Sequence, residues 1–224
     1  MSLPHSWPLN MLAIALACFL PARSDSFVEF SLPSDDSYLN FTSLLSIAQP
    51  DFTNLLSFDL AGAVVSLSSP VQIRTVPDTW ATWNSPPFTE SPTPRVLFSN
   101  QSNTLTMDFS KPYSIFGFEA EPESLGVSVV SVSFFNGAVL VGSISQPVDG
   151  DGGAMLFAAL TDGAFTRVTV SAPEDTGFAM AQVRATAVPE PSMTIVFAIA
   201  GMILLGIKTR RVLGRQLSVY CSKA

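Results

Sequence analysis

Residues 127–145 read VSVVSVSFFNGAVLVGSIS, two runs of alternating apolar and polar residues on either side of Asn136-Gly137. An Asn-Gly pair between alternating hydrophobic residues is the strongest short-range signal for a β-hairpin. The stretch therefore predicts two antiparallel strands, residues 127–135 and 138–145, joined by a tight turn.

Similar short segments recur on both sides of this hairpin, each with apolar residues at every second position. They are residues 27–32, 55–60, 63–67, 104–109, 115–119, 155–160, 166–171 and 178–184. Only residues 39–47 are compatible with a helical turn or two. We therefore expect residues 25–187 to form an all-β body of about ten short strands, two antiparallel sheets packed face to face in a jelly-roll-like sandwich.

Charge is distributed unevenly along the 224-residue chain, whose net charge is −7. Residues 25–187 hold five basic and 17 acidic residues, a net charge of −12, whereas residues 208–224 hold five basic residues and no acid. Such an acidic body lacks the basic surface with which proteins bind nucleic acid. The contrast suggests two different surroundings for the body and the tail.

Histidine and cysteine are almost absent. The chain has one histidine, His5, and two cysteines, Cys18 and Cys221, all near its ends. The body therefore cannot form a Ser-His-Asp triad, a Cys-His pair or a histidine-ligated zinc site, and it has no disulfide. We expect no cofactor and no metal, and a fold stabilised by its apolar core alone.

The N-terminal residues have the pattern of a secretory signal peptide. Residues 11–20 read MLAIALACFL, and the small residues Ala22 and Ser24 precede a possible cleavage site before Asp25. This predicts a signal helix within residues 1–24, removed on export. The alternatives are a buried core helix and a lipoprotein signal ending at Cys18.

A second apolar stretch, MTIVFAIAGMILLGI, occupies residues 193–207. With its flanks it is long enough for a transmembrane helix, and Lys208, Arg210 and Arg211 follow it as a basic flank. The positive-inside rule then places residues 212–224 in the cytoplasm as a tail. The alternative is a buried C-terminal helix of the body.

Residues 188–211 as a whole resemble the PEP-CTERM sorting signal. The resemblance rests on Val188-Pro189-Glu190-Pro191-Ser192, then one hydrophobic helix, then Arg210-Arg211. It implies secretion by a Gram-negative bacterium and processing by an exosortase, a membrane enzyme. The chain would be anchored in the inner membrane by residues 193–207 and then sorted to the cell surface or extracellular matrix.

Two further points concern this resemblance. Family members usually end within a few residues of the basic cluster, whereas this chain continues for residues 212–224. Residues 104–186 also resemble the β-sandwich domain that often precedes the tag, although this is a likeness of pattern alone.

Residues 76–95, VPDTWATWNSPPFTESPTPR, form a proline-rich stretch without a strand pattern. Long loops of this kind are often functional. Trp80, Trp83 and Phe88 lie in it, and two interpretations are open. The rings are either exposed and stack on sugar rings of a polysaccharide, or they pack down as a lid over an open edge of the sandwich, which we favour.

Two acidic motifs are candidates for chemistry. Residues 149–153, DGDGG, have oxygen ligands suited to calcium but lack EF-hand spacing, and a plain hairpin turn explains them better. Glu119, Glu121 and Glu123 are the acidic residues from which a glycosidase acid and base would be drawn. Their sequence context instead predicts a strand that runs into an exposed loop.

Three functions follow as hypotheses. The first is a non-enzymatic exported protein of the envelope or biofilm matrix, with an exosortase as its processing partner. The second is a carbohydrate-binding module with the same destination that uses the Trp80 and Trp83 loop. The third is a glycosidase that works with carboxylates alone.

Overall fold

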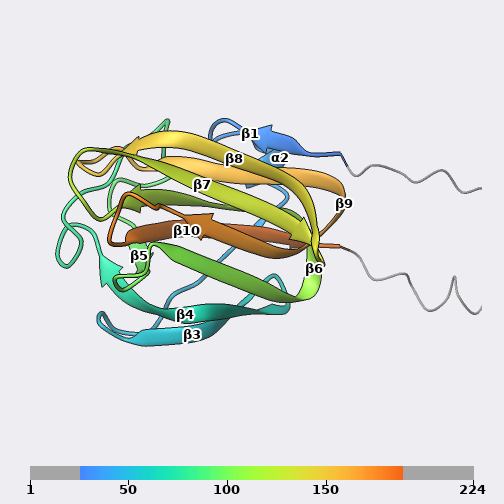
Figure 1. Cartoon of the computed structure of the whole chain (residues 1–224), viewed down its shortest axis with the longest axis horizontal. Coiled ribbons are helices and arrows are strands. Elements are labelled where there is room, and N and C mark those ends of the chain that lie inside the picture. Colours follow the sequence, from blue (N-terminus) through green and yellow to red (C-terminus); the bar gives the residue numbers. More distant parts are fainter. Residues whose placement is uncertain (1–25, 189–224) are drawn as a thin grey trace, which may run out of the picture. The chain divides into compact units, whose positions relative to one another are not determined.

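A computed structural model describes residues 26–188 (Figure 1). The predicted signal peptide (1–24), the sorting motif from Pro189 onward, the apolar stretch 193–207 and the basic flank lie outside these residues. Within the described part, no helix has the length and apolar character needed to cross a membrane.

Antiparallel strands dominate the described chain, which confirms the prediction of an all-β fold. Every strand pair is antiparallel. The elements are β1 (Val28–Phe30), α2 (Asp36–Leu39), β2 (Ser43–Leu44), β3 (Asn54–Leu60), β4 (Ala63–Thr75), β5 (Arg95–Phe98), β6 (Thr104–Pro122), β7 (Val127–Asn136), β8 (Val139–Asp149), β9 (Met155–Ser171) and β10 (Phe178–Ala187).

The predicted hairpin forms as expected. β7 pairs with β8 along its whole length, and Gly137 turns the chain with a φ of +60°, a conformation that favours glycine. The hairpin contains no charged residue between Ser124 and Val148.

Two long strands, β6 and β9, bend from one layer of the sandwich into the other. Residues 104–109 of β6 pair with β4 and with residues 167–171 of β9. Residues 115–120 of β6 pair instead with β10 and with residues 155–160 of β9. The register shifts near Tyr113, where both strands bend over from one layer into the other. The sequence predicted two short strands for each of these long, bent ones.

The first layer contains β3, β4, the first half of β6, the second half of β9, β7 and β8, and the last residues of β4, Gln72 to Thr75, also pair with β5 of the second layer. The second layer contains β1, the first half of β9, the second half of β6, β10, β5 and β2. Aromatic side chains fill the space between them, among them Phe116, Phe118, Phe134, Phe157 and Phe165, which are all fully buried. This apolar core accounts for a stable body without disulfides.

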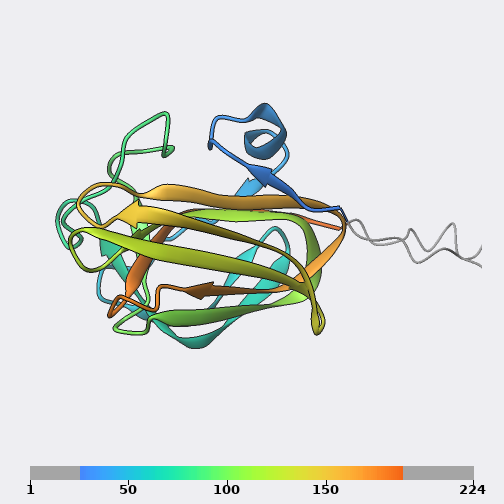
Figure 2. The same cartoon turned by 45° about the horizontal axis from the view of Figure 1, so that its top comes forward.

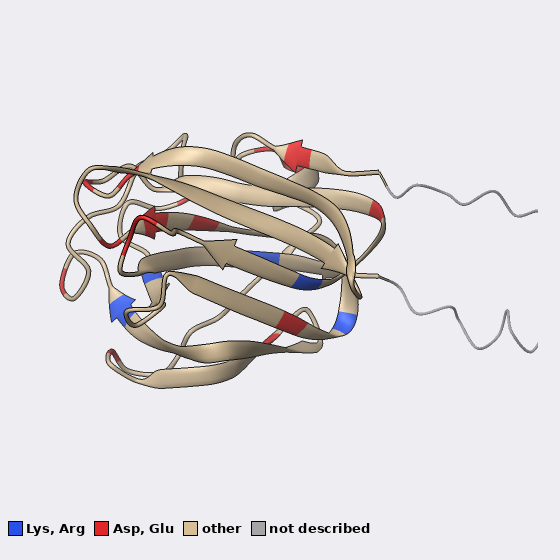
Figure 3. Cartoon of the chain, viewed as in Figure 1, with Lys and Arg blue, Asp and Glu red and all other residues tan. Residues whose placement is uncertain are grey.

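The two ends of the sandwich differ. At one end β6 and β9 bend over, and both described termini lie there: the Ser26 amide hydrogen-bonds Asp162, and Ala187 pairs with Tyr113 (Figure 1). We call this the closed end. At the opposite, loop end, hydrogen bonds join the connections 99–103, 123–126, 150–153 and 172–177. Acidic side chains gather at the loop end, whereas the β7–β8 hairpin is uncharged up to Asp149, the last residue of β8 (Figure 3).

Two segments cover the outer face of the second layer, α2 and the 76–94 loop (Figure 2). Asp35 caps α2 by accepting a hydrogen bond from the Ser37 amide. Tyr38 then packs against Phe30, with ring centroids 5.2 Å apart, and its hydroxyl lies over Gly117. A Cβ at position 117 would lie 2.2 Å from the Ala158 Cβ, so glycine is required for this close approach.

Candidate functional site: a sealed carboxylate pair and an open cleft

Glu119 and Glu121 lie on β6 with their side chains on the outer face of the second layer. Their neighbours Phe118 and Ala120 point into the interlayer core, since side chains alternate along a strand. Both glutamates are nevertheless 0% exposed. A second structure must therefore cover them.

The cover is the loop of residues 76–94, which we call the lid. Trp80 and Trp83 are each 8% exposed. They pack against a small apolar cluster on the outer face, formed by Val76, Val96, Phe98, Ala154, Ala179 and Ala181. Trp80 lies closest to Phe98, with ring centroids 5.3 Å apart.

Each tryptophan donates its indole N–H to one of the buried glutamates. The Trp80 Nε1 lies 2.7 Å from the Glu121 Oε2, and the Trp83 Nε1 lies 3.0 Å from the Glu119 Oε2. The second oxygen of each carboxyl also accepts hydrogen bonds. Glu119 Oε1 accepts from the Glu90 amide, and Glu121 Oε1 accepts from the Gly152 amide and the Thr82 hydroxyl.

A further ion pair fastens the far end of the lid to β10. Arg184 donates two hydrogen bonds of 2.7 Å to the two carboxylate oxygens of Glu90. This bidentate geometry is the stronger form of an arginine–carboxylate contact, and both side chains are largely buried. The Asn84 amide completes the attachment by donating to the Ala154 carbonyl.

Burial perturbs the acidity of both sealed carboxyls. Loss of hydration raises the pKa of Glu119 from 4.5 to about 7, against the opposing effect of its hydrogen bond from Trp83. The pKa of Glu121 likewise rises from 4.5 to about 7 because of burial, against the hydrogen bond from Trp80. Both groups thus titrate near neutral pH under a closed lid.

These contacts correct the sugar-stacking interpretation of Trp80 and Trp83. The faces of both rings are taken up by the apolar cluster and their N–H groups by carboxylates, so neither ring is open to a sugar. Only Phe88 among the three aromatic candidates is exposed, at 47%. The geometry matches the alternative interpretation, a lid packed onto the sandwich.

The carboxylate run is divided by the fold. Glu119 and Glu121 are sealed, whereas Glu123 lies at the rim of the loop end and accepts a hydrogen bond from the Thr176 hydroxyl. An acid and base for glycoside hydrolysis must flank a bound sugar and, in inverting enzymes, a water. The sealed pair offers neither a sugar nor a water any access.

Residues 149–153 form a turn. The Asp149 carboxylate accepts from the Asp151 amide, and the Asp149 carbonyl accepts from the Gly153 amide. The Gly152 amide is also part of the cradle around Glu121. Across residues 26–188, no three His, Cys, Asp or Glu side chains are placed to hold one metal ion.

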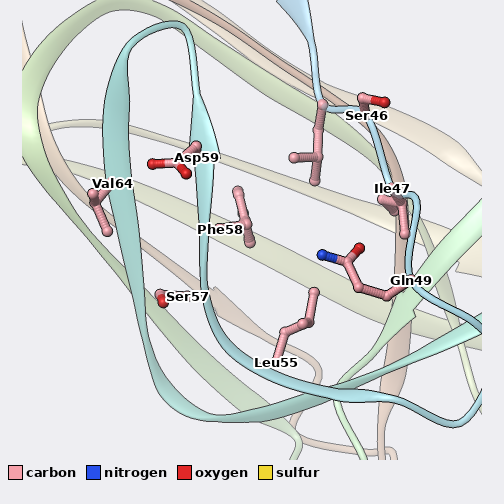
Figure 4. A pocket seen from close by; sticks show the side chains of 9 residues that line it. Ser46, Ile47, Gln49, Leu55, Ser57, Phe58, Asp59 and Val64 are labelled. Atoms are coloured by element: carbon pink, nitrogen blue, oxygen red, sulfur yellow. The ribbon is translucent and has the colours of Figure 1, made fainter.

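The structure also contains an open cleft that the sequence did not indicate. It has a volume of about 360 Å³ and lies between β3 and the segment 45–49, which follows β2 (Figure 4). Phe58, Leu55 and Gln49 point into the space between the two segments, whereas Asp59, Ser57 and Val64 lie on the side of the β3–β4 hairpin. The remaining lining residues are Leu45, Ser46 and Ile47.

A second hollow at the loop end differs in chemistry. Gln101, Ser102, Asn103, Glu123, Asp175 and Thr176 line it, all of them polar. Asp175 is already occupied by the Ser124 amide and hydroxyl and by the Ser128 hydroxyl. The cleft beside β3 is the better candidate for ligand binding because it combines apolar and polar lining.

Comparisons with known proteins give little further guidance. No family model and no curated protein matches the chain. The enzymatically active domain of tailspike protein 4 from bacteriophage CBA120 is 19% identical over 56% of this chain and 19% of its own, with a TM-score of 0.28. A variant of a family 29 carbohydrate-binding module is 10% identical over 72% of this chain and 91% of its own, with a TM-score of 0.24. Likenesses of this size carry no argument about function.

Proposed function

We propose that the protein is a non-enzymatic surface protein, exported by its N-terminal signal and displayed outside the inner membrane by its C-terminal segment. Residues 188–211 act as a PEP-CTERM-type sorting signal. An exosortase-type membrane enzyme processes it and passes the body to the cell surface or the extracellular matrix of a Gram-negative bacterium.

The position of the two described termini carries this proposal. The chain enters at Ser26 and leaves at Val188 from the same, closed end of the sandwich (Figure 1). A body of this kind can be held at one end by a membrane segment while its loop end stays free.

The chemistry of the body supports a binding or structural role. The two carboxyls with a raised pKa, Glu119 and Glu121, are buried under the lid and accept hydrogen bonds from it. Their raised pKa therefore goes with a structural contact between the lid and the sandwich. Trp80 and Trp83 provide no sugar-binding surface because both rings are buried.

The sorting signal is tested by replacing Pro189, Glu190 and Pro191 together with alanine in a strain that carries an exosortase. We expect insertion to persist, because the apolar stretch is unchanged, and the full-length form to accumulate in the membrane fraction. The wild-type chain should shorten and leave that fraction. Immunoblots of membrane and extracellular fractions report both size and location.

A matched control replaces Lys208, Arg210 and Arg211 with glutamate. Since these bases hold the helix end in the cytoplasm, we expect this variant to lose its orientation and retention, a defect distinct from blocked processing. The same size and distribution for wild type and the alanine variant, with and without the exosortase, would overturn the sorting proposal.

A further inference from the structure

We propose that the cleft between β3 and residues 45–49 binds a short, uncharged oligosaccharide. The proposal rests on the proposed function in one respect: export would bring the cleft into contact with extracellular polysaccharide. The volume of the cleft, its apolar and polar lining and its charge all favour such a ligand.

The cleft has an apolar wall formed by Leu55, Phe58 and Ile47. All three side chains are half-buried and pack on the interlayer core, so their positions are fixed while part of each surface stays open. Such a wall suits the C–H face of a sugar ring. A volume of about 360 Å³ falls within the range of small-molecule sites, roughly 300–1,000 Å³.

The polar groups around this wall have no partners within residues 26–188. The side chains of Ser46, Gln49, Ser57 and Asp59 accept and donate no hydrogen bond to the described protein. The Gln49 amide points into the space between the two segments, whereas the Ser57 hydroxyl and the Asp59 carboxylate line the cleft from the side of the β3–β4 hairpin. With the Ser46 hydroxyl, these groups can both donate to and accept from sugar hydroxyls. In the lid, by contrast, the polar side-chain groups of Trp80, Trp83 and Glu90 are already paired.

The negative charge of the cleft and of the body favours an uncharged sugar as the ligand. Asp59 is the only charged residue that lines the cleft, and no lysine or arginine is among the lining residues. The body around it carries a net charge of −12. A uronate or sulfated chain would therefore meet repulsion with no base to pair with its acidic groups.

An added peptide strand is the less suitable occupant. The β3 ladder shifts register between Leu55 and Ser57, and such an irregularity interrupts the regular edge that strand addition needs. Residues 45–49 also run beside β3 on the far side of the cleft, where an added strand would lie (Figure 4).

The test is isothermal titration of the full-length chain in a zwitterionic detergent without a sugar head group. The probes are cellotetraose, xylotetraose and mannotetraose, with oligogalacturonate as the anionic probe. We expect saturable binding of at least one neutral probe and none of the anionic one. Replacing Gln49 and Asp59 together with alanine should weaken that binding at least tenfold, because two hydrogen-bonding groups are lost.

Both replaced side chains are at the surface, so the melting temperature should stay unchanged. The matched control replaces Gln101 and Asn103 in the loop-end hollow with alanine and should leave affinity unchanged. Absence of binding to all three neutral probes would overturn the proposal, as would equal weakening by the control pair. Because the experiment uses purified protein, its outcome is independent of whether the protein is exported and sorted.

Discussion

Replacing Trp80 and Trp83 with alanine is expected to lower the free energy of unfolding by about 3–5 kcal/mol for each ring. Two losses add up. The apolar cluster loses its largest members, and Glu119 and Glu121 each lose an indole donor while remaining buried. The double variant would lose a large part of the 5–15 kcal/mol that is typical for a folded domain.

The measurement is urea unfolding of the secreted body, residues 25–188, followed by circular dichroism. Phe88→Ala is the matched control, because this aromatic residue lies in the same lid but is exposed. It should change the free energy of unfolding by less than about 1 kcal/mol. If the tryptophan variants are as mild as the Phe88 control, the lid does not pack as described.

Stability should also fall as the pH rises from about 4.5 to above 7. The sealed carboxyls keep their protons up to about pH 7 in the folded protein but release them near pH 4.5 when the chain unfolds. The unfolded state is therefore favoured as pH rises through this window. The difference in pKa between the folded and unfolded states corresponds to about 3 kcal/mol of stability for each carboxyl. This contribution is fully present below pH 4.5 and is lost as the pH rises above 7.

At acidic pH, stability is limited by carboxylates that are hydrogen-bonded in the folded protein, such as Asp51. Hydrogen bonds from Thr79 and Thr75 lower the pKa of Asp51, so its contribution is lost as the pH falls below about 4. We expect the melting temperature of the body to be highest near pH 4 to 5. A Glu119→Gln, Glu121→Gln variant serves as the control, since it cannot titrate and should show a flatter profile between pH 5 and 8. A wild-type profile that rises over this range would contradict the account.

The hairpin at Asn136-Gly137 could be predicted because its information is local. Alternation fixes the strands on either side and the turn needs only two residues. Residues 104–109 and 115–119 were predicted as two separate strands. In the structure the stretch between them is a bend of one strand, and the bend depends on the pairing of β6 with β9, which lies far along the chain.

The contacts that the lid makes with β6 could not be predicted from the sequence. The sequence predicted a long loop over residues 76–95, yet the partners of its two tryptophans lie 41 and 36 residues further on in β6. One signal was available: buried indoles need acceptors, and Glu119 and Glu121 are two residues apart, which places them on one face if the strand predicted at 115–119 continues. The cleft beside β3 had no such signal, because its lining residues are ordinary apolar and small polar ones brought together by the fold.

The central claim is that the body lies outside the inner membrane while the tail lies inside, and thiol labelling tests it most directly. The body contains no cysteine, so Asn103→Cys places a single thiol at the exposed loop end when Cys18 and Cys221 are changed to serine. A second chain keeps Cys221 alone. Both are produced in a strain without an exosortase, so that the tail is retained, and spheroplasts are treated with a membrane-impermeant maleimide. We expect the thiol at position 103 to react in intact spheroplasts and Cys221 to react only after permeabilisation. Reaction of Cys221 with protection of position 103, or protection of both thiols, would contradict the account.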